Sequence, residues 1–241
     1  MLAPDPYDKT ETPSGSELQD MAIPKTIYQT YKSAQLPLLT RWHIGRMRRR
    51  NPEYDYQFYD DARIESFIEE HYDADTLSLY KRINIGAAKA DFFRYAVLYK
   101  KGGVYLDIDS VAVAKLDSFI APSDRAIIST ETDLMHRVQW ALIYEPGHVF
   151  LRRTLEKVAD NLKNNRYPHN VHRMTGPGAY TEAIKECLRD EPNAAYRDMG
   201  IDYENALKFT YPMAKFFLYG FGRKNHWQKE SRSKPVITSR E

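Results

Sequence analysis

The stretch that decides the fold is NIGAAKADFFRYAVLYKKGGVYLDIDSVAV, which spans residues 84–113. Its first half predicts a helix, because Asn84 is a good N-cap and the alanine, leucine and aromatic residues give a continuous apolar face. Gly102 and Gly103 predict the end of this helix, since glycine readily takes the left-handed conformation that closes one. The two glycines could also let a ligand approach the backbone closely.

A short strand that ends in two acids follows the glycine turn. Residues 104–106 are apolar enough for a buried strand, and they run into Asp107-Ile108-Asp109. Residues i and i+2 of an extended chain point the same way, so both carboxylates would share one side of the strand end. Paired carboxylate oxygens suit Mg²⁺ or Mn²⁺, with water and substrate phosphates completing the coordination. The pattern therefore predicts a divalent-cation site.

Length and composition favour one α/β domain over residues 23–241. The 241 residues can bury a sizeable core, and a hydrophobic fraction of 42% is ordinary for a globular protein. A net charge of +2 gives no reason to expect nucleic acid as a partner. The single cysteine, Cys187, excludes an internal disulfide framework and a cysteine-rich zinc site.

The N-terminal segment and the length of the apolar runs indicate where in the cell the protein is expected. Residues 1–22 are rich in Pro, Asp, Thr, Ser and Gly without a period, which predicts a flexible leader that lacks a signal-peptide core. No apolar run approaches the ~18 residues that span a bilayer, and no N-x-S/T glycosylation site is present. We therefore expect a cytoplasmic protein, with peripheral contact with a membrane as an open alternative.

Strands alternate with helices along the rest of the chain. β-Branched and aromatic residues predict strands at 23–30, 54–59, 111–113, 126–129, 138–144 and 209–211. Apolar residues at helical spacing predict helices at 38–50, 62–70, 76–82, 148–161 and 179–189. This alternation predicts an α/β fold with a Rossmann-like, mixed but mostly parallel sheet flanked by helices. Ligands of such sheets bind at the carboxyl ends of strands, where the D-x-D motif lies.

The helix predicted at 38–50 is markedly basic. It contains five arginines, namely Arg41, Arg46, Arg48, Arg49 and Arg50. One interpretation is a solvated helix face, and the other is a docking surface for an anionic membrane or an anionic acceptor. The sequence leaves both interpretations open.

Five segments occur in an order that is known from one family. They are IPKTIYQT (23–30), NPEYDYQFYDD (51–61), AAKADFFRYAVLYKKGGVYLDID (87–109), RVQWALIYEPGH (137–148) and TGPGAYT (175–181). With them the chain resembles the D-x-D sugar-transferase family, which includes fungal α-1,6-mannosyltransferases, inositol-phosphoceramide mannosyltransferases and bacterial capsule transferases. The third segment is the most specific, and the last two look most like the fungal mannosyltransferase branch.

This resemblance implies a GT-A fold and a metal-dependent glycosyltransferase that retains the configuration at the anomeric carbon. The donor would be GDP-mannose or a UDP-hexose, with mannose favoured, and the acceptor would be a glycan or a glycolipid. The cofactor would be Mn²⁺ or Mg²⁺, because a divalent cation neutralises the diphosphate that leaves while positive charge builds on the sugar.

The resemblance also assigns roles to residues. It implies that Asp109 is the direct metal ligand, with Asp107 in the same motif nearer the ribose. Asp91 would hold hydroxyl groups of the donor sugar, and Arg94 would lie beside the sugar and the phosphates. His226 resembles a late histidine of the family that lies beside the diphosphate, and it is a third candidate metal ligand.

Further residues are candidates for the donor site. Gln139 would place a catalytic amide beside the donor sugar, and the neighbouring Trp140 would lie either beneath a saccharide or in the core. Tyr28 stands where the family usually has histidine. The candidate donor-binding residues are Tyr28, Gln29, Thr30, Gly102, Gly103, Tyr105, Gly176 and Pro177.

Plainer interpretations of these residues stay open. Asp91 and Arg94 are three apart on one helix face and could form only a local salt bridge. Residues 176–178 either offer backbone N–H groups to an anion or a hydroxyl at a helix N-terminus, or form a simple junction. Glu131 and Asp133 either face the acceptor or are exposed acids of a loop.

A haloacid-dehalogenase-type phosphatase is the alternative function. Such enzymes use a strand that ends in D-x-D-x-T/V, which residues 107–111 match, and Asp107 would then be the nucleophile that forms an aspartyl-phosphate. That motif normally opens the first strand of its domain, whereas about a hundred residues precede it here. The chain also shows no convincing downstream lysine or paired-aspartate motif, so the sequence favours the transferase.

Overall fold

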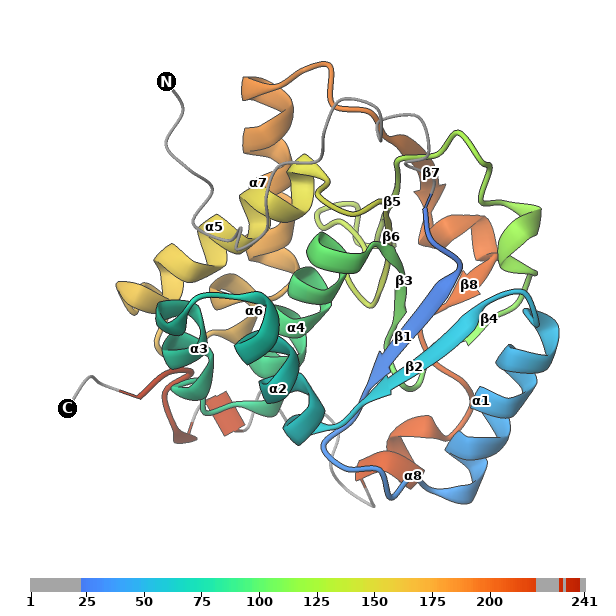
Figure 1. Ribbon diagram of the computed structural model, residues 1–241, viewed down its shortest axis with the longest axis horizontal. Coiled ribbons are helices and arrows are strands. Elements are labelled where there is room, and N and C mark those ends of the chain that lie inside the picture. Colours follow the sequence, from blue (N-terminus) through green and yellow to red (C-terminus); the bar gives the residue numbers. More distant parts are fainter. Residues whose placement is uncertain (1–22, 220–229, 232, 239–241) are drawn as a thin grey trace.

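A six-stranded mixed sheet forms the centre of the molecule (Figure 1). The computed structural model describes residues 23–219, 230–231 and 233–238, so the predicted leader lies outside the described residues. The strand order is β2-β1-β3-β6-β5-β7, and the pairs β1–β2, β1–β3 and β5–β7 are parallel. The predicted α/β class with a mixed, mostly parallel sheet is confirmed. The strands are β1 (Thr26–Thr30), β2 (Asp55–Tyr59), β3 (Gly103–Leu106), β5 (Ala126–Thr130), β6 (Ala141–Tyr144) and β7 (Arg197–Ile201).

Helices cover both faces of this sheet (Figure 1). α4, α5, α6 and α7 lie on one face, and α1 with the small sheet of β4 (Val111–Ala112) and β8 (Leu207–Lys208) lies on the other. Among the described residues, none of the helices combines the length and the apolar character needed to cross a bilayer. The helices are α1 (Leu38–Arg50), α2 (Asp61–His71), α3 (Ala74–Lys81), α4 (Gly86–Lys101), α5 (Val149–Lys163), α6 (Val171–Met174), α7 (Pro177–Asp190) and α8 (Ala214–Tyr219).

Alternating residues of the strands divide the core between the two faces. Tyr105 of β3 and Leu142 of β6 pack in the cluster that includes α4 and α5, whereas Val104 and Ile143 pack in the cluster beneath α1. All four residues are at most 1% exposed. Because side chains alternate along a strand, a strand covered on both faces needs apolar residues at successive positions, as these strands have.

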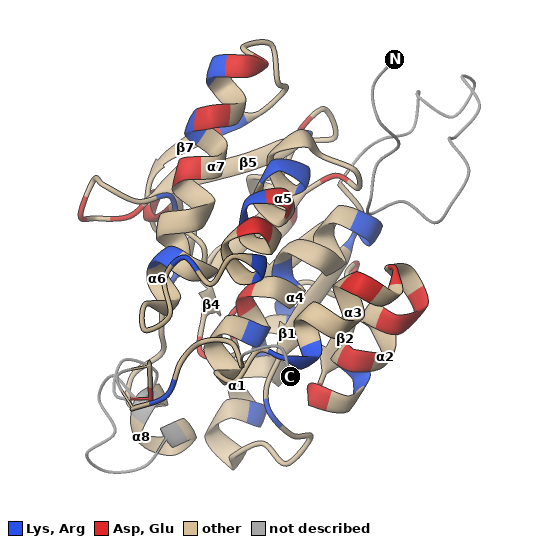
Figure 2. Ribbon diagram, turned by 90° about the vertical axis from the view of Figure 1, so that its left-hand side faces the viewer, with Lys and Arg blue, Asp and Glu red and all other residues tan. Residues whose placement is uncertain are grey.

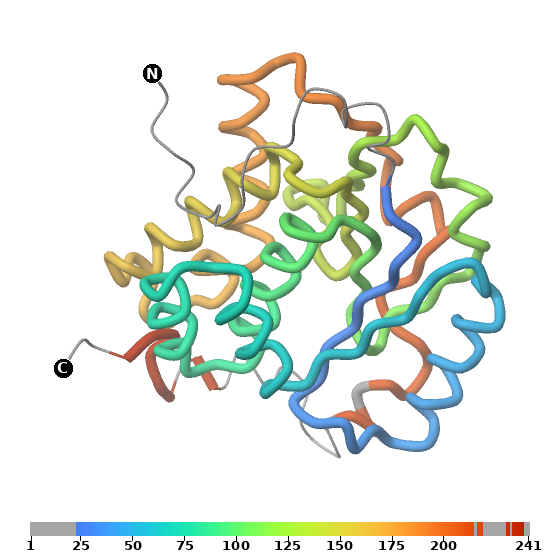
Figure 3. Tube along the Cα trace, in the orientation of Figure 1, coloured from blue at the N-terminus to red at the C-terminus, as the bar shows by residue number. Residues whose placement is uncertain are grey.

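The chain passes from α4 directly into β3 at the centre of the fold (Figure 3). Gly102 closes α4 with a φ of +62°, and a Cβ there would lie 2.6 Å from Pro146 Cδ. The predicted glycine stop is confirmed. The predicted N-cap is wrong, because Ile85 occupies that position while Asn84 Nδ2 donates to the carbonyl of Pro235 at 3.2 Å. Asn84 therefore connects the start of α4 with the C-terminal segment.

The other differences from prediction concern short elements. The helix at 38–50 is confirmed at both ends. The strand predicted at 209–211 is wrong, because β8 lies at Leu207–Lys208, where it pairs antiparallel with β4. The polar sequence of β7, RDMGI, gives no strand pattern, and its pairing with β5 is what makes it a strand.

Candidate active site

A cavity of about 520 Å³ opens at one edge of the central sheet. Thr30 ends β1, Asp107 follows β3 and Glu131 follows β5, and all three residues line the cavity. Gln139 and Trp140, which precede the antiparallel strand β6, line it too. Ligand pockets typically measure ~300–1,000 Å³. The D-x-D motif therefore lies at a pocket of suitable size, on the edge of the sheet where the topology predicts a ligand site.

Asp91 is a buried carboxylate of α4 that its neighbours hold in place. Its Oδ1 accepts a hydrogen bond from Gln139 Nε2 at 2.8 Å and lies 3.3 Å from Arg94 Nη2. Its Oδ2 accepts from Thr175 Oγ1 at 2.8 Å. Burial raises the pKa of Asp91, while Arg94 and the two hydrogen bonds oppose the shift. Since Asp91 also lines the cavity, these contacts orient its carboxylate toward a ligand site in advance.

Arg94 connects α4 to the D-x-D motif. Its Nη2 lies 3.0 Å from Asp107 Oδ1, and its Nη1 donates to the carbonyl of Gln139 at 2.7 Å. The guanidinium group lies 4.7 Å from the ring centroid of Tyr105, and the side chain is 6% exposed. The contact between Asp91 and Arg94 is therefore part of a network that reaches the D-x-D motif, and it is not only a local salt bridge.

The D-x-D acids lie in a turn. β3 ends at Leu106, and the N–H of Ser110 donates to the carbonyl of Asp107 at 2.9 Å. The prediction that the two acids share one side of an extended strand is therefore wrong. Asp107 and Asp109 nevertheless both line the cavity, because the turn brings them to the same edge of the sheet.

Each acid of the motif has its own supporting contacts. Asp107 Oδ1 accepts from the Tyr105 hydroxyl at 3.1 Å, and the Asp107 carbonyl accepts from Gln29 Nε2 at 3.1 Å. Asp109 Oδ2 accepts from Thr210 Oγ1 at 3.3 Å. Hydrogen bonds from neighbouring side chains thus orient both carboxylates.

The chemistry of Asp107 and Asp109 fits Mn²⁺ or Mg²⁺. Burial raises the pKa of Asp107 to about 7, and the neighbouring carboxylate of Asp109 adds to this shift while Arg94 opposes it. A cation between two carboxylates favours their ionised forms and so offsets the cost of burying them together. Asp107 remains 26% exposed, so solvent and ligands reach it. Mn²⁺ and Mg²⁺ need only one or two protein carboxylates, because water and substrate phosphates complete their coordination.

A second group of chelating side chains lies in the loop between β5 and β6. Ligand atoms of Glu131, Asp133 and His136 lie within 4.8 Å of one another. His136 Nδ1 and Asp133 Oδ2 already form a hydrogen bond at 2.7 Å. Burial, and next the charge of Asp133, raises the pKa of Glu131 to about 7. Asp133 is exposed, as expected for an acid of a loop, whereas Glu131 lines the cavity, so contact with an acceptor stays a prediction for Glu131.

Four of the predicted donor-binding residues line the cavity, namely Thr30, Tyr105, Gly176 and Pro177. Of the two interpretations of residues 176–178, the simple junction fits Gly176 and Pro177, because neither offers an N–H group to a ligand. The N–H of Gly176 already donates to the carbonyl of Val171 at 3.0 Å, and proline has no N–H group. These two residues therefore contribute shape to the cavity wall.

The other predicted donor-binding residues do not line the cavity. Gly102 and Gly103 lie at the start of β3, whereas the cavity opens at its carboxyl end. Tyr28 is 5% exposed and packs in the core, where a Cβ at Gly103 would lie 3.1 Å from its ring. Gln29 is buried, and its Nε2 donates to the carbonyl of Asp107. His226 lies outside the described residues.

Some contacts of the site leave no trace in the sequence pattern. Thr175 and Thr210 hydrogen-bond to Asp91 and Asp109, although 84 and 101 positions separate the partners. His172 lines the cavity from α6, a four-residue helix that sequence periodicity cannot detect. Only the fold brings these residues to the acids.

Comparison with solved structures identifies the fold. Similar solved structures include the PaToxG glycosyltransferase, with a TM-score of 0.54, 18% identity and coverage of 71% of this chain and 70% of that chain. A UDP-bound glycosyltransferase domain from the YGT toxin matches with a TM-score of 0.52, 9% identity and coverage of 74% and 80%. The fold is that of GT-A-like glycosyltransferase domains.

Sequence comparison then narrows the class to a family. Residues 39–126 match the model of the glycosyltransferase sugar-binding region containing a DXD motif, so this part of the chain belongs to that family. The initiation-specific alpha-1,6-mannosyltransferase of Schizosaccharomyces pombe is 31% identical over 69% of this chain and 49% of that protein. Inositol phosphoceramide mannosyltransferase 3 of the same organism is 29% identical over 73% and 48%. The chain thus spans about half the length of these curated relatives, and the expected family is confirmed.

Proposed function

We propose that the protein is a metal-dependent glycosyltransferase that moves a hexose from a nucleotide-sugar donor to a glycan or glycolipid acceptor. The observation that carries the proposal is the convergence of Asp91, Arg94, Asp107 and Asp109 on one cavity. The names of the relatives favour mannose as the sugar, which makes GDP-mannose the first donor to test and a UDP-hexose the second.

The leaving diphosphate is the main charge that such a site has to stabilise. When bound, Mn²⁺ or Mg²⁺ supplies Lewis-acid stabilisation of that diphosphate, and Asp107 and Asp109 would hold the ion. Arg94 adds a fixed positive charge. Its contacts with Asp91, Asp107 and the Gln139 carbonyl hold the guanidinium in place, so little reorganisation is needed when negative charge develops.

The donor sugar would bind against Asp91. An ionised carboxylate has about four acceptor positions, and Asp91 uses three of them, for Gln139 and Arg94 at Oδ1 and for Thr175 at Oδ2. A sugar hydroxyl can therefore still donate to Asp91 from the cavity. Trp140 and Phe209, with ring centroids 5.8 Å apart, add an aromatic wall against which a sugar ring can pack.

We extend the proposal to retention of configuration at the anomeric carbon, which the family resemblance implies. The anomer of the product, determined by proton NMR, tests this part separately. No observation favours the phosphatase alternative. Asp107 Oδ1 is engaged by Arg94 and Tyr105, and the motif lies within the region that matches a glycosyltransferase family.

Donor hydrolysis without an acceptor tests the proposed activity. We expect the protein to release nucleoside diphosphate from GDP-mannose, or from a UDP-hexose, with Mn²⁺ and not with excess EDTA. Asp109→Asn should lower the rate by roughly 100-fold or more while the protein stays folded. Asp190→Asn, which changes a surface ion pair on α7, should leave the rate unchanged. Equal rates with and without chelator, or turnover of p-nitrophenyl phosphate alone, would contradict the proposal.

A further inference from the structure

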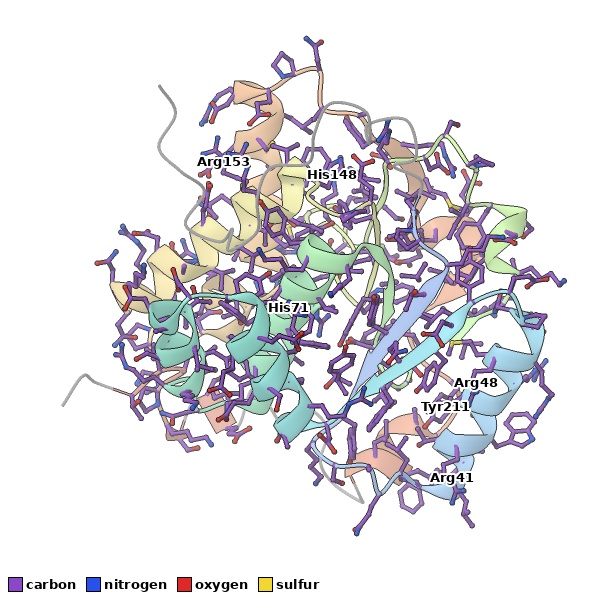
Figure 4. All side chains as sticks on the ribbon, viewed as in Figure 1. Arg41, Arg48, His71, His148, Arg153 and Tyr211 are labelled. Carbon is purple, nitrogen blue, oxygen red and sulfur yellow. The ribbon has the colours of Figure 1, made fainter. Side chains whose placement is uncertain are left out.

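The outer face of α1 combines apolar and cationic side chains. We call Leu38, Arg41, Trp42, Arg46, Arg48 and Arg49 the α1 face. Leu38 and Trp42 are 79% and 51% exposed, although burial is the usual state for such residues. They lie one helical turn apart, opposite the buried residues Ile44 and Met47. Figure 4 shows Arg41 and Arg48 along this helix, with Tyr211 of the neighbouring segment alongside.

No acid within α1 offsets the charge of this face. The helix contains five arginines and no aspartate or glutamate, whereas α2 contains four acidic residues (Figure 2). Among the described residues, none of the five arginines forms an ion pair, and Arg50 donates instead to the carbonyl of Ala112 at 2.7 Å. In α5, by contrast, Arg152 and Arg153 each pair with an acid at 3.1 Å. Within the described residues, the exposed arginines of α5 thus have acidic partners, whereas the arginines of α1 have none.

Exposed apolar side chains continue onto the neighbouring α8 and the residue that precedes it. Met213 and Phe217 are 64% and 42% exposed. The segment before α8 is joined to α1, because the ring of Tyr211 stacks on His43 with centroids 3.9 Å apart and its hydroxyl bonds to Thr40 Oγ1 at 2.7 Å. Large apolar side chains on two packed elements form a surface of the kind that usually binds a partner.

We infer that the α1 face, with Met213 and Phe217, docks on a lipid bilayer that carries anionic headgroups. The arginines match the phosphate and carboxylate groups of such a surface, and Leu38 and Trp42 match the apolar boundary beneath the headgroups. A soluble polyanion would pair with the arginines but would leave Leu38 and Trp42 in water. The combination of both kinds of side chain therefore favours a bilayer.

The docking surface lies beside the cavity. Tyr31 and Lys32, which precede α1, line the cavity, and Leu218 of α8 lines it next to the exposed Phe217. The Tyr31 hydroxyl donates to the carbonyl of Leu218 at 2.8 Å, so these two segments meet at the cavity wall. Docking would bring the headgroup of a lipid-linked acceptor to the donor site, and this last step alone rests on the proposed function.

Flotation of the full chain with vesicles tests the docking without any donor. We compare phosphatidylcholine vesicles with vesicles that also contain phosphatidylserine, at low and high salt. Each basic residue near an anionic bilayer strengthens binding by roughly fivefold, so Arg41→Glu with Arg49→Glu should weaken binding to the anionic vesicles by at least about tenfold. Lys163→Glu with Lys185→Glu makes the same charge change at exposed sites of α5 and α7 and should have little effect.

A variant of unchanged charge separates a bilayer from a soluble polyanion. Trp42→Ser should weaken vesicle binding by about tenfold, because it removes the largest exposed apolar side chain of the face. The blue shift of tryptophan fluorescence on vesicle binding should disappear with it. The inference is overturned if the unchanged protein does not bind vesicles. It is also overturned if Trp42→Ser binds them as tightly as the unchanged protein does. Equal weakening by the arginine and the lysine pairs overturns it too. Since no donor is present, these outcomes leave the test by donor hydrolysis untouched.

Discussion

Arg94 contacts groups from three parts of the chain, and its planar guanidinium makes these contacts from fixed directions. Lysine keeps the charge but has no planar fork, so Arg94→Lys should lower kcat/KM for the donor by roughly 10- to 100-fold. Steady-state donor hydrolysis measures this. Arg197→Lys is the matched control, because Arg197 makes two hydrogen bonds to Asp124 away from the cavity, at 2.9 and 2.7 Å. It should lower the Tm and leave kcat/KM unchanged, and an Arg94→Lys variant with an unchanged kcat/KM would remove Arg94 from the donor site.

Glu131 leads to a prediction about pH. Burial raises its pKa from an ordinary value near 4.5 to about 7, so the folded protein binds more protons than the unfolded chain between these values. The contribution of Glu131 to the free energy of unfolding therefore falls as the pH rises from about 4.5 to 7 and stays low above. Glu131→Gln lacks this dependence, so we expect it to be more stable relative to the unchanged protein at pH 8 than at pH 5. Urea denaturation measures the difference.

The control for this pH effect is Glu69→Gln at an exposed position of α2, which removes the same charge far from the loop. Its stability relative to the unchanged protein should not vary with pH in the same way. If Glu131→Gln differs from the unchanged protein by the same free energy of unfolding at both pH values, the pKa of Glu131 is not raised as described.

Sequence reasoning predicts the location of residues that belong to a recognisable motif. Asp91, Arg94 and the two D-x-D acids lie at one cavity, as the resemblance implies. The sequence does not predict that Thr210 belongs to the site, because its hydrogen bond to Asp109 joins positions far apart in the chain. No periodicity or motif encodes such a contact.

At the scale of elements, the turn between α4 and β3 gives a direct test of the fold. Gly102 has a φ of +62°, and a methyl group there would lie 2.6 Å from the Pro146 side chain. Gly102→Ala should therefore lower the free energy of unfolding by about 1–3 kcal/mol, measured by chemical denaturation. Gly86→Ala is the control, because the new methyl group would have no atom within 4 Å apart from the backbone of its own helix and its chain neighbours. A Gly102→Ala variant as stable as Gly86→Ala would show that the turn is not strained by a side chain.

Long elements are predicted well and short ones poorly, for a physical reason. α1 and α4 carry their own periodicity and end signals, so the pattern finds them. β7, β8 and α6 have two to five residues, and their form depends on pairing or packing with distant parts of the chain. The turn at the D-x-D motif belongs to the same group, since Gln29 and Tyr211 donate hydrogen bonds to the carbonyls of Asp107 and Asp109 from distant positions in the chain.

At the scale of the whole molecule, the site is a product of sheet topology. β1, β3 and β5 end at one edge while the antiparallel β6 begins there, so acids and aromatic residues from separate segments meet at one cavity. The class of sheet could be predicted from the alternation of elements. The order of its strands could not, because it depends on long-range pairing.

Asp107 and Asp109 should make donor binding depend on a divalent cation. Titration calorimetry with GDP and with UDP, in Mn²⁺ or in excess EDTA, tests it most directly, because it requires neither turnover nor an acceptor. We predict that at least one nucleotide binds at least about tenfold more tightly with Mn²⁺, and that Asp109→Asn abolishes this difference while its Tm stays near that of the unchanged protein. Equal affinity with and without the cation, or a cation effect that survives in Asp109→Asn, would contradict the account.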